Sequence, residues 1–319
     1  MDYTSLYTPV SIPSSRWKIG YKDSILLLGS CFADSMSGKL HEHYFRVEDN
    51  PFGVLYNPSS IATAIAMARQ GVRIEPQDLV EYGGMWHSMV HHGQFSDVDK
   101  HKVLERCNAS IEVLRNALQH ATVITITFGT AWVYEYEGKV VGNCHKLPAN
   151  SFLRRRMTVE EIVAMWQPII ESMPHKHWIF TVSPIRHIKD GLHENQISKA
   201  VLLQAVDALA SSPHRLIASS PYRLSYFPSY EIMLDELRDY RFYAEDMVHP
   251  SELAVDYIWQ RFVDAFMTED TRKEMKTLHQ LWCDRQHKLL HPDSPAAIAF
   301  QNNVARRLDE LQKRYPWIE

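Results

Sequence analysis

The chain has 319 residues, and with 45% of them hydrophobic it can bury the core of one large α/β domain with additions. Its 34 basic and 38 acidic residues give a formal net charge of −4 without a dense basic stripe, which argues against nucleic acid as a partner. The four cysteines lack the spacing of a zinc ribbon or a disulfide framework, and the early apolar run at 25–28 is too short for a signal core or a membrane span. We therefore expect a cytoplasmic protein without a membrane partner.

Strand-like and helix-like segments alternate along the chain. The first strand is expected at 24–29 and is followed at once by a helical pattern with Phe32, Met36 and Leu40 on one face. Further strands are predicted at about 45–48 and at 122–128, 178–182 and 215–219, and apolar residues recur at helical spacing over 102–119, 159–173 and 194–210. This alternation is typical of βαβ crossovers, so we predict an α/β fold whose mostly parallel sheet is covered on both faces.

Three segments depart from this alternation. Residues 80–98 are rich in glycine, histidine and aromatic residues and indicate an inserted hairpin, and residues 132–150 resemble a second hairpin. Beyond about 268 the sequence becomes helical and charged. We expect one domain over 1–268 with these two insertions. The C-terminal helical extension over 269–319 is expected to pack on the sheet or on a partner, which would make the protein a homo-oligomer.

A serine stands where the first strand is expected to pass into the first helix. Ser30 follows an apolar run and Gly29, which places its hydroxyl at the carboxyl end of a strand beside the free N–H groups of a helix N-terminus. Those groups favour developing negative charge, and open α/β sheets bind ligands at this edge. Serine is also a favoured N-cap, so helix capping is the alternative role.

An acid and an imidazole lie three residues apart far downstream, at Asp246 and His249. With Ser30 they supply the parts of a serine hydrolase: His249 would accept the hydroxyl proton, and Asp246 would fix the imidazole tautomer. The alternative is an ordinary turn before a helix that starts near Ser251. We interpret Ser30 as the nucleophile because the distant acid–histidine pair accompanies it.

The residues Gly29-Ser30-Cys31-Phe32-Ala33 resemble the motif that names the GSCFA family, a branch of the SGNH (GDSL-like) hydrolases. Over roughly residues 20–265, further segments are similar to that family, namely Asn50-Pro51-Phe52-Gly53, Thr127-Phe128-Gly129-Thr130-Ala131-Trp132, Asn143-Cys144-His145-Lys146, Thr181-Val182-Ser183-Pro184-Ile185-Arg186-His187 and Asp246-Met247-Val248-His249-Pro250. The resemblance implies a three-layer α/β/α fold with a flavodoxin-like parallel sheet. It also implies a Ser-Asp-His esterase site made of Ser30, Asp246 and His249, although Gly29 stands where the superfamily usually has an acid.

The resemblance also implies an oxyanion hole. Gly53 and Gly129 match two glycines of the superfamily, and the backbone N–H groups of Gly53 and of the nucleophile are the expected donors. The asparagine expected two residues after Gly129 is Ala131 in this chain. The missing donor is expected to be replaced by Thr130, by Asn143 or by a backbone group.

Ser183 and His187 form a rival serine–histidine pair after the predicted strand 178–182. Pro184 follows the serine directly and prevents a tight turn into a helix, so we interpret Arg186 and His187 as substrate-side residues. Anion binding by Arg186 and structural hydrogen bonding in the loop remain alternative roles.

Aromatic and histidine side chains of the two insertions are candidates for the walls of a substrate cleft. We place Trp86, His87, Trp132, Asn143 and His145 there, while Trp86 and Trp132 could equally belong to the core. Clustered histidines can bind a metal, but no carboxylate or cysteine accompanies these at a recognised spacing, so we expect no metal and no other cofactor.

Cys31 directly follows the predicted nucleophile and could use the same histidine, because a helix N-terminus lowers the pKa of a thiol. Neighbouring side chains leave a turn in different directions, so only one of the two can face His249. We expect Cys31 to pack beneath the first helix.

These patterns predict a serine esterase or acyl-transfer enzyme acting on an O-acyl ester, with an acetylated carbohydrate or a small metabolite as the expected substrate. A non-catalytic module that keeps the site geometry for ligand binding is the alternative, and the loss of the oxyanion-hole asparagine favours it. A helical scaffold that self-associates through 269–319 is a third interpretation.

Overall fold

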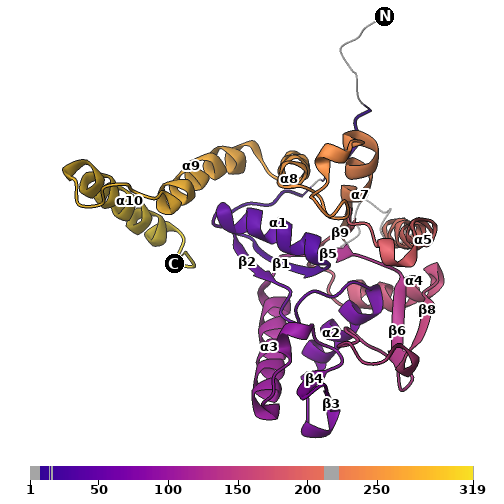
Figure 1. Ribbon diagram of the computed structural model, residues 1–319. Coiled ribbons are helices and arrows are strands. Elements are labelled where there is room, and N and C mark those ends of the chain that lie inside the picture. Colours follow the sequence, from indigo (N-terminus) through magenta and orange to yellow (C-terminus); the bar gives the residue numbers. More distant parts are fainter. Residues whose placement is uncertain (1–7, 14, 16, 212–222, 319) are drawn as a thin grey trace, which may run out of the picture.

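A five-stranded parallel sheet forms the centre of the molecule in the computed structural model, which describes residues 8–13, 15, 17–211 and 223–318 (Figure 1). The strands lie side by side in the order β2 (Arg46–Asp49), β1 (Ser24–Gly29), β5 (Val123–Phe128), β9 (His177–Val182) and β10 (Arg223–Phe227). All four neighbouring pairs are parallel. The chain therefore runs from β1 to one edge of the sheet and then returns to build the other side.

The predicted strands agree with the sheet at four positions. The apolar runs 24–29, 122–128 and 178–182 form β1, β5 and β9, whose residues are almost all buried, and the short run near 45–48 forms β2. The predicted strand at 215–219 lies outside the described residues. The fifth strand that the structure does describe is β10, a little further along the chain.

Helices flank the sheet because alternate strand residues face two separate cores. Leu26 and Leu28 of β1 belong to a core shared with α2 (Pro58–Gln70), α3 (Lys100–His120), α4 (Val159–Glu171) and α5 (Leu192–Ala210). Ile25 and Leu27 belong to a second core shared with α1 (Cys31–Glu42) and α8 (Glu252–Phe266). The α/β architecture with a parallel sheet is thus confirmed.

Helix α2 was not predicted, although its ends carry clear sequence signals. The side chain of Asn57 accepts a hydrogen bond from the backbone N–H of Ser60, and Pro58 occupies the first turn, where its missing N–H does no harm. The helix ends at Gly71, whose left-handed backbone is a common helix terminator. This helix brings Asn57 to the edge of the sheet where the strands end.

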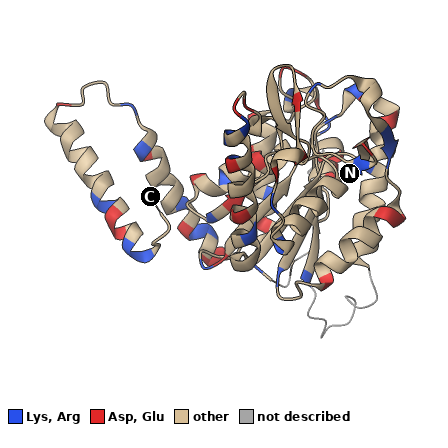
Figure 2. Cartoon of the chain, turned by 90° about the horizontal axis from the view of Figure 1, so that it is seen from below, with Lys and Arg blue, Asp and Glu red and all other residues tan. Residues whose placement is uncertain are grey.

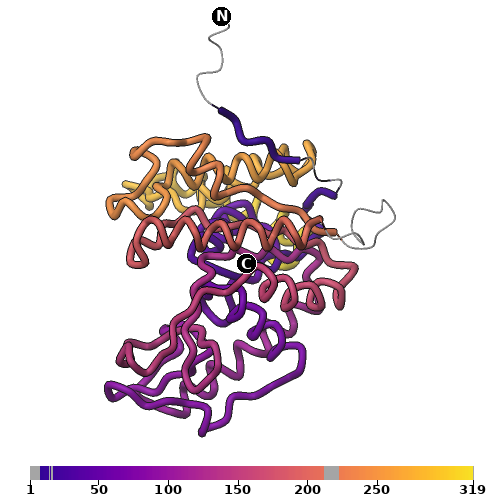
Figure 3. The backbone as a smooth tube through the Cα atoms, turned by 90° about the vertical axis from the view of Figure 1, so that its right-hand side faces the viewer, coloured from indigo at the N-terminus to yellow at the C-terminus, as the bar shows by residue number. Residues whose placement is uncertain are grey.

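The two insertions fold as small antiparallel units. Strands β3 (Leu79–Tyr82) and β4 (Met85–Ser88) form the first predicted hairpin. The second, β6 (Trp132–Tyr136) and β7 (Lys139–Val140), gains a third strand, β8 (Leu153–Arg156), that was not predicted. In the side view of Figure 3 the residues from about 50 to 150 occupy the lower half of the molecule and the chain beyond 223 the upper half. Short helical turns complete the fold at Pro76–Asp78, Gly93–Phe95, Ala149–Ser151, Ile188–Asp190, Ser229–Glu231, Ile232–Leu237 and Tyr240–Phe242.

The C-terminal extension forms two helices that project to one side, α9 (Glu269–Gln286) and α10 (Pro295–Arg314) (Figure 1). Its end returns to its own chain: the ring of Tyr315 lies 5.3 Å from that of Tyr21, and the indole N–H of Trp317 donates to the carbonyl oxygen of Tyr44 at 3.2 Å. Basic and acidic residues both occur on these two helices (Figure 2). No helix in the described part of the chain has the length and apolar character needed to cross a membrane.

Candidate active site

The strand order creates a natural crevice. The connections that leave β1 and β5 run to opposite sides of the sheet, and ligands bind outside the carboxyl ends of strands at such a switch point. A cavity of about 680 Å³ lies there. Segments far apart in the sequence line it, including Cys31, Tyr56, Asn57, Thr130, Trp132, Asn143, Cys144, Arg186, His187, Asp246 and His249.

The end of β1 requires a glycine. Gly29 has a φ of 141°, and a Cβ atom at this position would lie 2.1 Å from the carbonyl oxygen of Thr127. The backbone N–H of Gly29 donates to the side chain of Asn50 at 2.8 Å, and that of Ser30 donates to the Thr127 carbonyl at 3.1 Å. The turn from β1 into α1 is therefore tied to the strands on both sides, which fixes the start of α1.

The loop before α8 forms the acid–histidine pair that the sequence predicts. Oδ2 of Asp246 lies 2.6 Å from Nδ1 of His249, and Oδ1 accepts the backbone N–H groups of Val248 and His249 at 2.9 Å each. These three hydrogen bonds lower the pKa of Asp246 to about 2. Met247, which directly follows Asp246, has a backbone φ of 57°, a strained conformation for a residue other than glycine. The N–H of Arg186 donates to the Val248 carbonyl and holds the loop against the end of β9.

The other imidazole nitrogen faces Cys31 rather than Ser30. Nε2 of His249 lies 3.7 Å from Sγ of Cys31, within the range of a hydrogen bond to sulfur. Ser30 is only 1% exposed, and its Oγ has no hydrogen-bond partner among the described residues. The expectation that Cys31 packs beneath α1 holds only in part, because the half-buried residue packs against the core that α1 shares and also lines the cavity. The hydroxyl of Ser30 neither caps α1 nor contacts His249.

Opposing effects act on the Cys31 thiol. Burial raises its pKa, and the carboxylate of Asp34 acts in the same direction. Hydrogen bonds from the backbone N–H groups of Cys31 and Phe32, at the start of α1, lower the pKa, as does the charge of Lys199. The net effect is a raised pKa, so the thiol is protonated near neutral pH and depends on a base to ionise.

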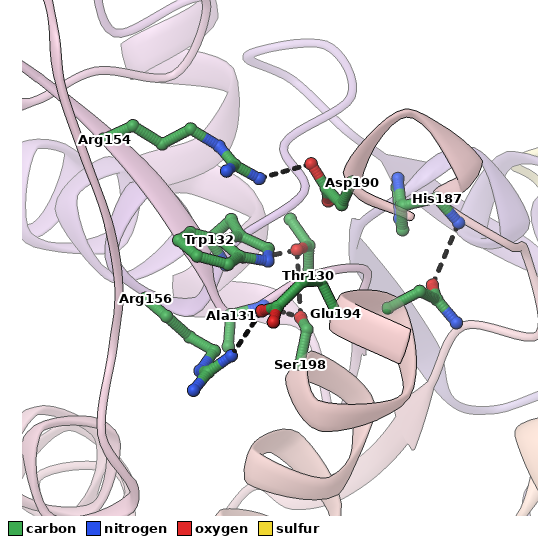
Figure 4. Close-up of polar contacts among 10 residues, drawn as sticks. Thr130, Ala131, Trp132, Arg154, Arg156, His187, Asp190, Glu194 and Ser198 are labelled. Carbon is green, nitrogen blue, oxygen red and sulfur yellow. Dashed lines mark hydrogen bonds and ion pairs between the residues drawn. The ribbon is translucent and has the colours of Figure 1, made fainter. Parts of the chain in front are cut away.

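Helix α5 supports the cavity with polar side chains on its buried face (Figure 4). The side chain of Asn195 accepts the backbone N–H of His187 at 2.9 Å, and Oγ of Ser198 accepts that of Ala131 at 2.8 Å. These bonds hold the loops after β9 and β5, respectively. The apolar residues that recur at helical spacing over 194–210 did not reveal this polar part of the buried face.

Lys199, on the same face of α5, lies directly beneath the strand ends. It is 1% exposed, and its ammonium group donates to the carbonyl oxygens of Gly129 at 2.6 Å and Ser183 at 2.7 Å. Burial, together with the nearby charge of Arg186, lowers its pKa to about 7, while Cys31 acts in the opposite direction. The sequence signal for this buried charge was the position of Lys199, one helical turn before Leu202 on the buried face of α5.

The comparison with known families adds one decisive result. The model of the GSCFA family matches residues 24–262, which is most of the chain and includes β1, the turn with Cys31 and the acid–histidine loop. The chain belongs to the GSCFA family. No curated protein and no solved structure shows significant similarity to it.

One wall of the GSCFA site is the small sheet of β6, β7 and β8. The guanidinium of Arg154 stacks 3.7 Å above the ring of Trp132, and it pairs with Asp190 across the cavity rim (Figure 4). Arg156 binds Glu194 of α5 at 2.8 Å. These pairs join the small sheet to α5, and Trp132 lies at the cavity as the sequence predicts.

The backbone donors expected in the oxyanion hole are already engaged. The N–H of Gly53 donates to the carbonyl of Asn50 at 2.6 Å in a turn. The N–H groups of Gly129 and Thr130 both donate to the carbonyl of Tyr56, at 2.7 and 3.0 Å. The placement expected for these three groups is therefore not found, because each N–H points to a carbonyl of the protein itself.

Two amide side chains offer replacement donors at the cavity. Oδ1 of Asn57 accepts the N–H of Ser60, and Oδ1 of Asn143 accepts the N–H of His145, both at 2.8 Å. Nδ2 of each asparagine has no hydrogen-bond partner among the described residues, and both side chains line the cavity. Asn143 was predicted at this site from the sequence, whereas Asn57 was not.

Arg186 and His187 also line the cavity, as expected for substrate-side residues. The ring of His187 meets that of Tyr56 edge-on at 6.0 Å, and burial lowers the pKa of His187 to about 4. Ser183, the rival nucleophile, is fully buried and its Oγ accepts the N–H of Ile185 at 3.3 Å. The rival serine–histidine pair is therefore not formed.

Trp86, His87 and His145 lie outside the cavity, in contrast to the expectation. His87 is buried with both ring nitrogens in hydrogen bonds, to Ser96 and to the Tyr82 carbonyl. The rings of His87 and His145 stack 4.6 Å apart, and His145 is buried too. Trp86 packs on the core beneath the ammonium of Lys100. In the described part of the chain, histidine, cysteine and carboxylate side chains nowhere gather in threes as a metal site requires.

Proposed function

We propose that this GSCFA protein is an acyl-transfer enzyme of the SGNH-like hydrolase type, with a three-layer α/β/α fold. It would cleave an O-acyl ester through a covalent acyl intermediate and release the acyl group to water or to a second hydroxyl compound. One observation carries the proposal: the carboxylate of Asp246 lies 2.6 Å from Nδ1 of His249, while Nε2 faces the turn at the start of α1. An oriented imidazole beside a nucleophile is the arrangement that acyl transfer requires.

The carboxylate of the acid–histidine pair determines which nitrogen of the imidazole can act as a base. Because the pKa of Asp246 is lowered to about 2, this carboxylate is ionised near neutral pH and acts only as an acceptor. It therefore holds the proton of the neutral imidazole on Nδ1 and leaves the lone pair of Nε2 toward α1. His249 is then a base for the attacking group and an acid for the departing alcohol.

The cavity walls support a small polar ester as substrate. Trp132 offers an aromatic surface next to Arg154, and Arg186 supplies a cation near the acid–histidine pair. An acetylated carbohydrate suits the aromatic wall, and an acidic metabolite suits the arginine. The amide groups of Asn57 and Asn143 are the donors that we assign to the oxyanion.

Turnover of p-nitrophenyl acetate by the full chain tests this proposal. His249→Ala is expected to abolish turnover because it removes the base whose Nε2 faces the start of α1. His175→Ala, which alters an exposed histidine in the loop before β9, should leave the rate unchanged. Equal rates for the native protein and His249→Ala would contradict the proposal.

A non-catalytic ligand-binding module remains the second candidate. The specific observation in its favour is that Ala131 replaces the expected asparagine and that the N–H groups of Gly53, Gly129 and Thr130 are all bonded internally. A folded protein that binds esters, yet neither turns them over nor forms a covalent adduct, would favour this module over the enzyme.

A further inference from the structure

We propose that the nucleophile of this site is the thiol of Cys31 and that Ser30, the residue before it, is a buried packing residue. The inference rests on the proposed acyl-transfer function and changes its chemistry from an ester to a thioester intermediate. The observation behind it is that the imidazole of His249 faces the side chain of Cys31 and not that of Ser30.

Ser30 is in no position to attack a substrate. It is 1% exposed, and a Cβ atom added to Gly129 of the neighbouring strand end would lie 3.3 Å from the Cβ of Ser30. Its Oγ has no hydrogen-bond partner among the described residues, so neither His249 nor any other base is placed to accept its proton. Ser30 is also absent from the residues that line the cavity.

Cys31 meets the requirements that Ser30 does not. Its side chain lines the cavity and its Sγ lies 3.7 Å from Nε2 of His249. Because Asp246 holds the imidazole proton on Nδ1, Nε2 accepts the S–H proton. Burial raises the pKa of the Cys31 thiol, and hydrogen bonding from the N–H groups of Cys31 and Phe32 opposes this by favouring the thiolate.

A second cysteine–histidine pair in the same chain shows what is special about this arrangement. On α9, Sγ of Cys283 lies 3.8 Å from Nε2 of His279, nearly the same distance as at the candidate site. Cys283 is exposed on the helix surface, and the carboxylate of Glu42 lies 3.9 Å from the same nitrogen, Nε2 of His279. His279 lines a separate cavity, but Cys283 is not among the residues that line it, and the described residues place no carboxylate on Nδ1 of His279. This pair therefore serves as an internal control.

The acylation half of the reaction follows from this geometry. As Sγ of Cys31 forms a bond to the acyl carbon, its proton moves to Nε2 of His249, and the carbonyl electrons move to oxygen. The resulting oxyanion collapses, the bond to the alcohol oxygen breaks, and His249 returns the proton to that oxygen. The alcohol leaves, and the acyl group remains on Cys31 as a thioester.

The second half releases the acyl group. Water or a second hydroxyl compound gives its proton to Nε2 of His249 while its oxygen attacks the thioester carbon. The new tetrahedral species collapses, the carbon–sulfur bond breaks, and the sulfur of Cys31 takes the proton back from His249. The products are the free acid or a new ester, and the thiol is regenerated without an oxidant or a further co-reactant.

Acyl trapping on the full chain tests the assignment. The native protein is mixed with p-nitrophenyl acetate, quenched in acid and digested, and the acetylated peptide is sequenced by mass spectrometry. We expect an acetyl group on Cys31 that neutral hydroxylamine removes, and its loss in His249→Ala. Acetylation of Cys283 should be the same in both proteins, because that thiol does not depend on His249.

Turnover by two variants supplies the matched comparison. Cys31→Ala is expected to lower the rate by about a thousandfold or more, as the loss of a nucleophile does. Ser30→Ala should retain the rate within about threefold and should fold, because the hydroxyl that it removes makes no hydrogen bond with a described residue. Circular dichroism of both variants checks the fold.

The outcomes separate this inference from the proposed function. An acetyl group on Ser30, or loss of turnover in Ser30→Ala but not in Cys31→Ala, overturns the cysteine assignment and leaves acyl transfer intact. No adduct on either residue, with a rate that does not depend on His249, overturns both. Should Cys31→Ala fail to fold, the position of the adduct in the native protein still decides the question.

Discussion

Cys31 and His249 are 218 positions apart in the sequence, yet Sγ of the first lies 3.7 Å from Nε2 of the second. They meet because every strand of a parallel sheet ends at the same edge: Cys31 follows β1, and the loop of His249 is held to the end of β9 through the N–H of Arg186. The fold thus brings the base and the thiol together from two separate strand ends, those of β9 and β1. Backbone hydrogen bonds fix the place of each segment, and the carboxylate of Asp246 orients the imidazole of His249.

Asp246→Asn tests whether the carboxylate controls the imidazole tautomer. An amide can still accept the N–H groups of Val248 and His249, so the loop should keep its shape. Its NH₂ group, however, favours the proton on Nε2, which removes the base from Cys31. We expect kcat to fall on the order of 10⁴-fold, with a modest loss of thermal stability at neutral pH because an amide replaces the ionised carboxylate in these hydrogen bonds. Steady-state kinetics and thermal melts measure both, and a rate near that of the native protein would contradict the role of Asp246.

The same carboxylate predicts how stability depends on acid. Its pKa is about 2 in the folded chain, below the ordinary value of 3.8, so the unfolded chain binds more protons in this window. Asp246 therefore stabilises the fold above about pH 4 and loses this effect as the pH falls toward 2. Urea unfolding between pH 5 and pH 3 should show a shallower loss of stability for Asp246→Asn than for the native protein. Parallel curves would argue against this assignment.

Most of the sheet could be predicted because burial dictates its sequence. Strands β1, β5 and β9 are covered on both faces, so they appear as unbroken apolar runs. Strand β8 escaped prediction because Leu153 and the three arginines after it mix exposed and half-buried positions. Those arginines are held in place by contacts with residues that are distant in the sequence, such as Asp190, Glu194 and the ring of Trp132.

The candidate site could be predicted only in part. The pair Asp246 and His249 is local in sequence, and its spacing already indicates the contact. The choice between Ser30 and Cys31 is different, because consecutive residues at the start of a helix point about 100° apart and the sequence does not reveal the rotation of the helix. Asn57 and Lys199 were missed since their positions near the cavity follow from how α2 and α5 dock.

Asn57→Asp tests the oxyanion donor without disturbing its helix. Aspartate caps helices as well as asparagine does, so the bond from the N–H of Ser60 and the stability of α2 should persist. The change removes the NH₂ group and adds a negative charge where the oxyanion is expected to form. We expect kcat to fall by about a hundred- to a thousandfold with an unchanged melting temperature. A rate within about twofold of the native protein would exclude Asn57 as the donor.

Arg186→Gln tests for an acidic group on the substrate. The Arg186 guanidinium lines the cavity, and within the described residues it has neither an ion pair nor a side-chain hydrogen bond. We expect KM for p-nitrophenyl hydrogen succinate to rise by roughly ten- to a hundredfold, because a charge-assisted hydrogen bond is lost. The KM for neutral p-nitrophenyl acetate should hardly change. Equal changes for the two esters would indicate a structural role for the arginine.

Lys199→Met tests the buried lysine beneath the strand ends. At pH 7 the variant leaves the carbonyls of Gly129 and Ser183 without a donor, which costs about 1–3 kcal/mol for each. The native lysine has a pKa of about 7, below the ordinary 10.5, so above pH 7 the unfolded chain binds a proton that the folded chain has released. The free energy of unfolding of the native protein minus that of the variant should therefore increase as the pH rises from 7 to 9, by at most about 1.4 kcal/mol per pH unit.

Urea unfolding at several pH values measures this difference. Lys189→Met, which alters an exposed lysine at the cavity rim, is the control. A difference that stays constant with pH would show that Lys199 keeps its proton in the folded state.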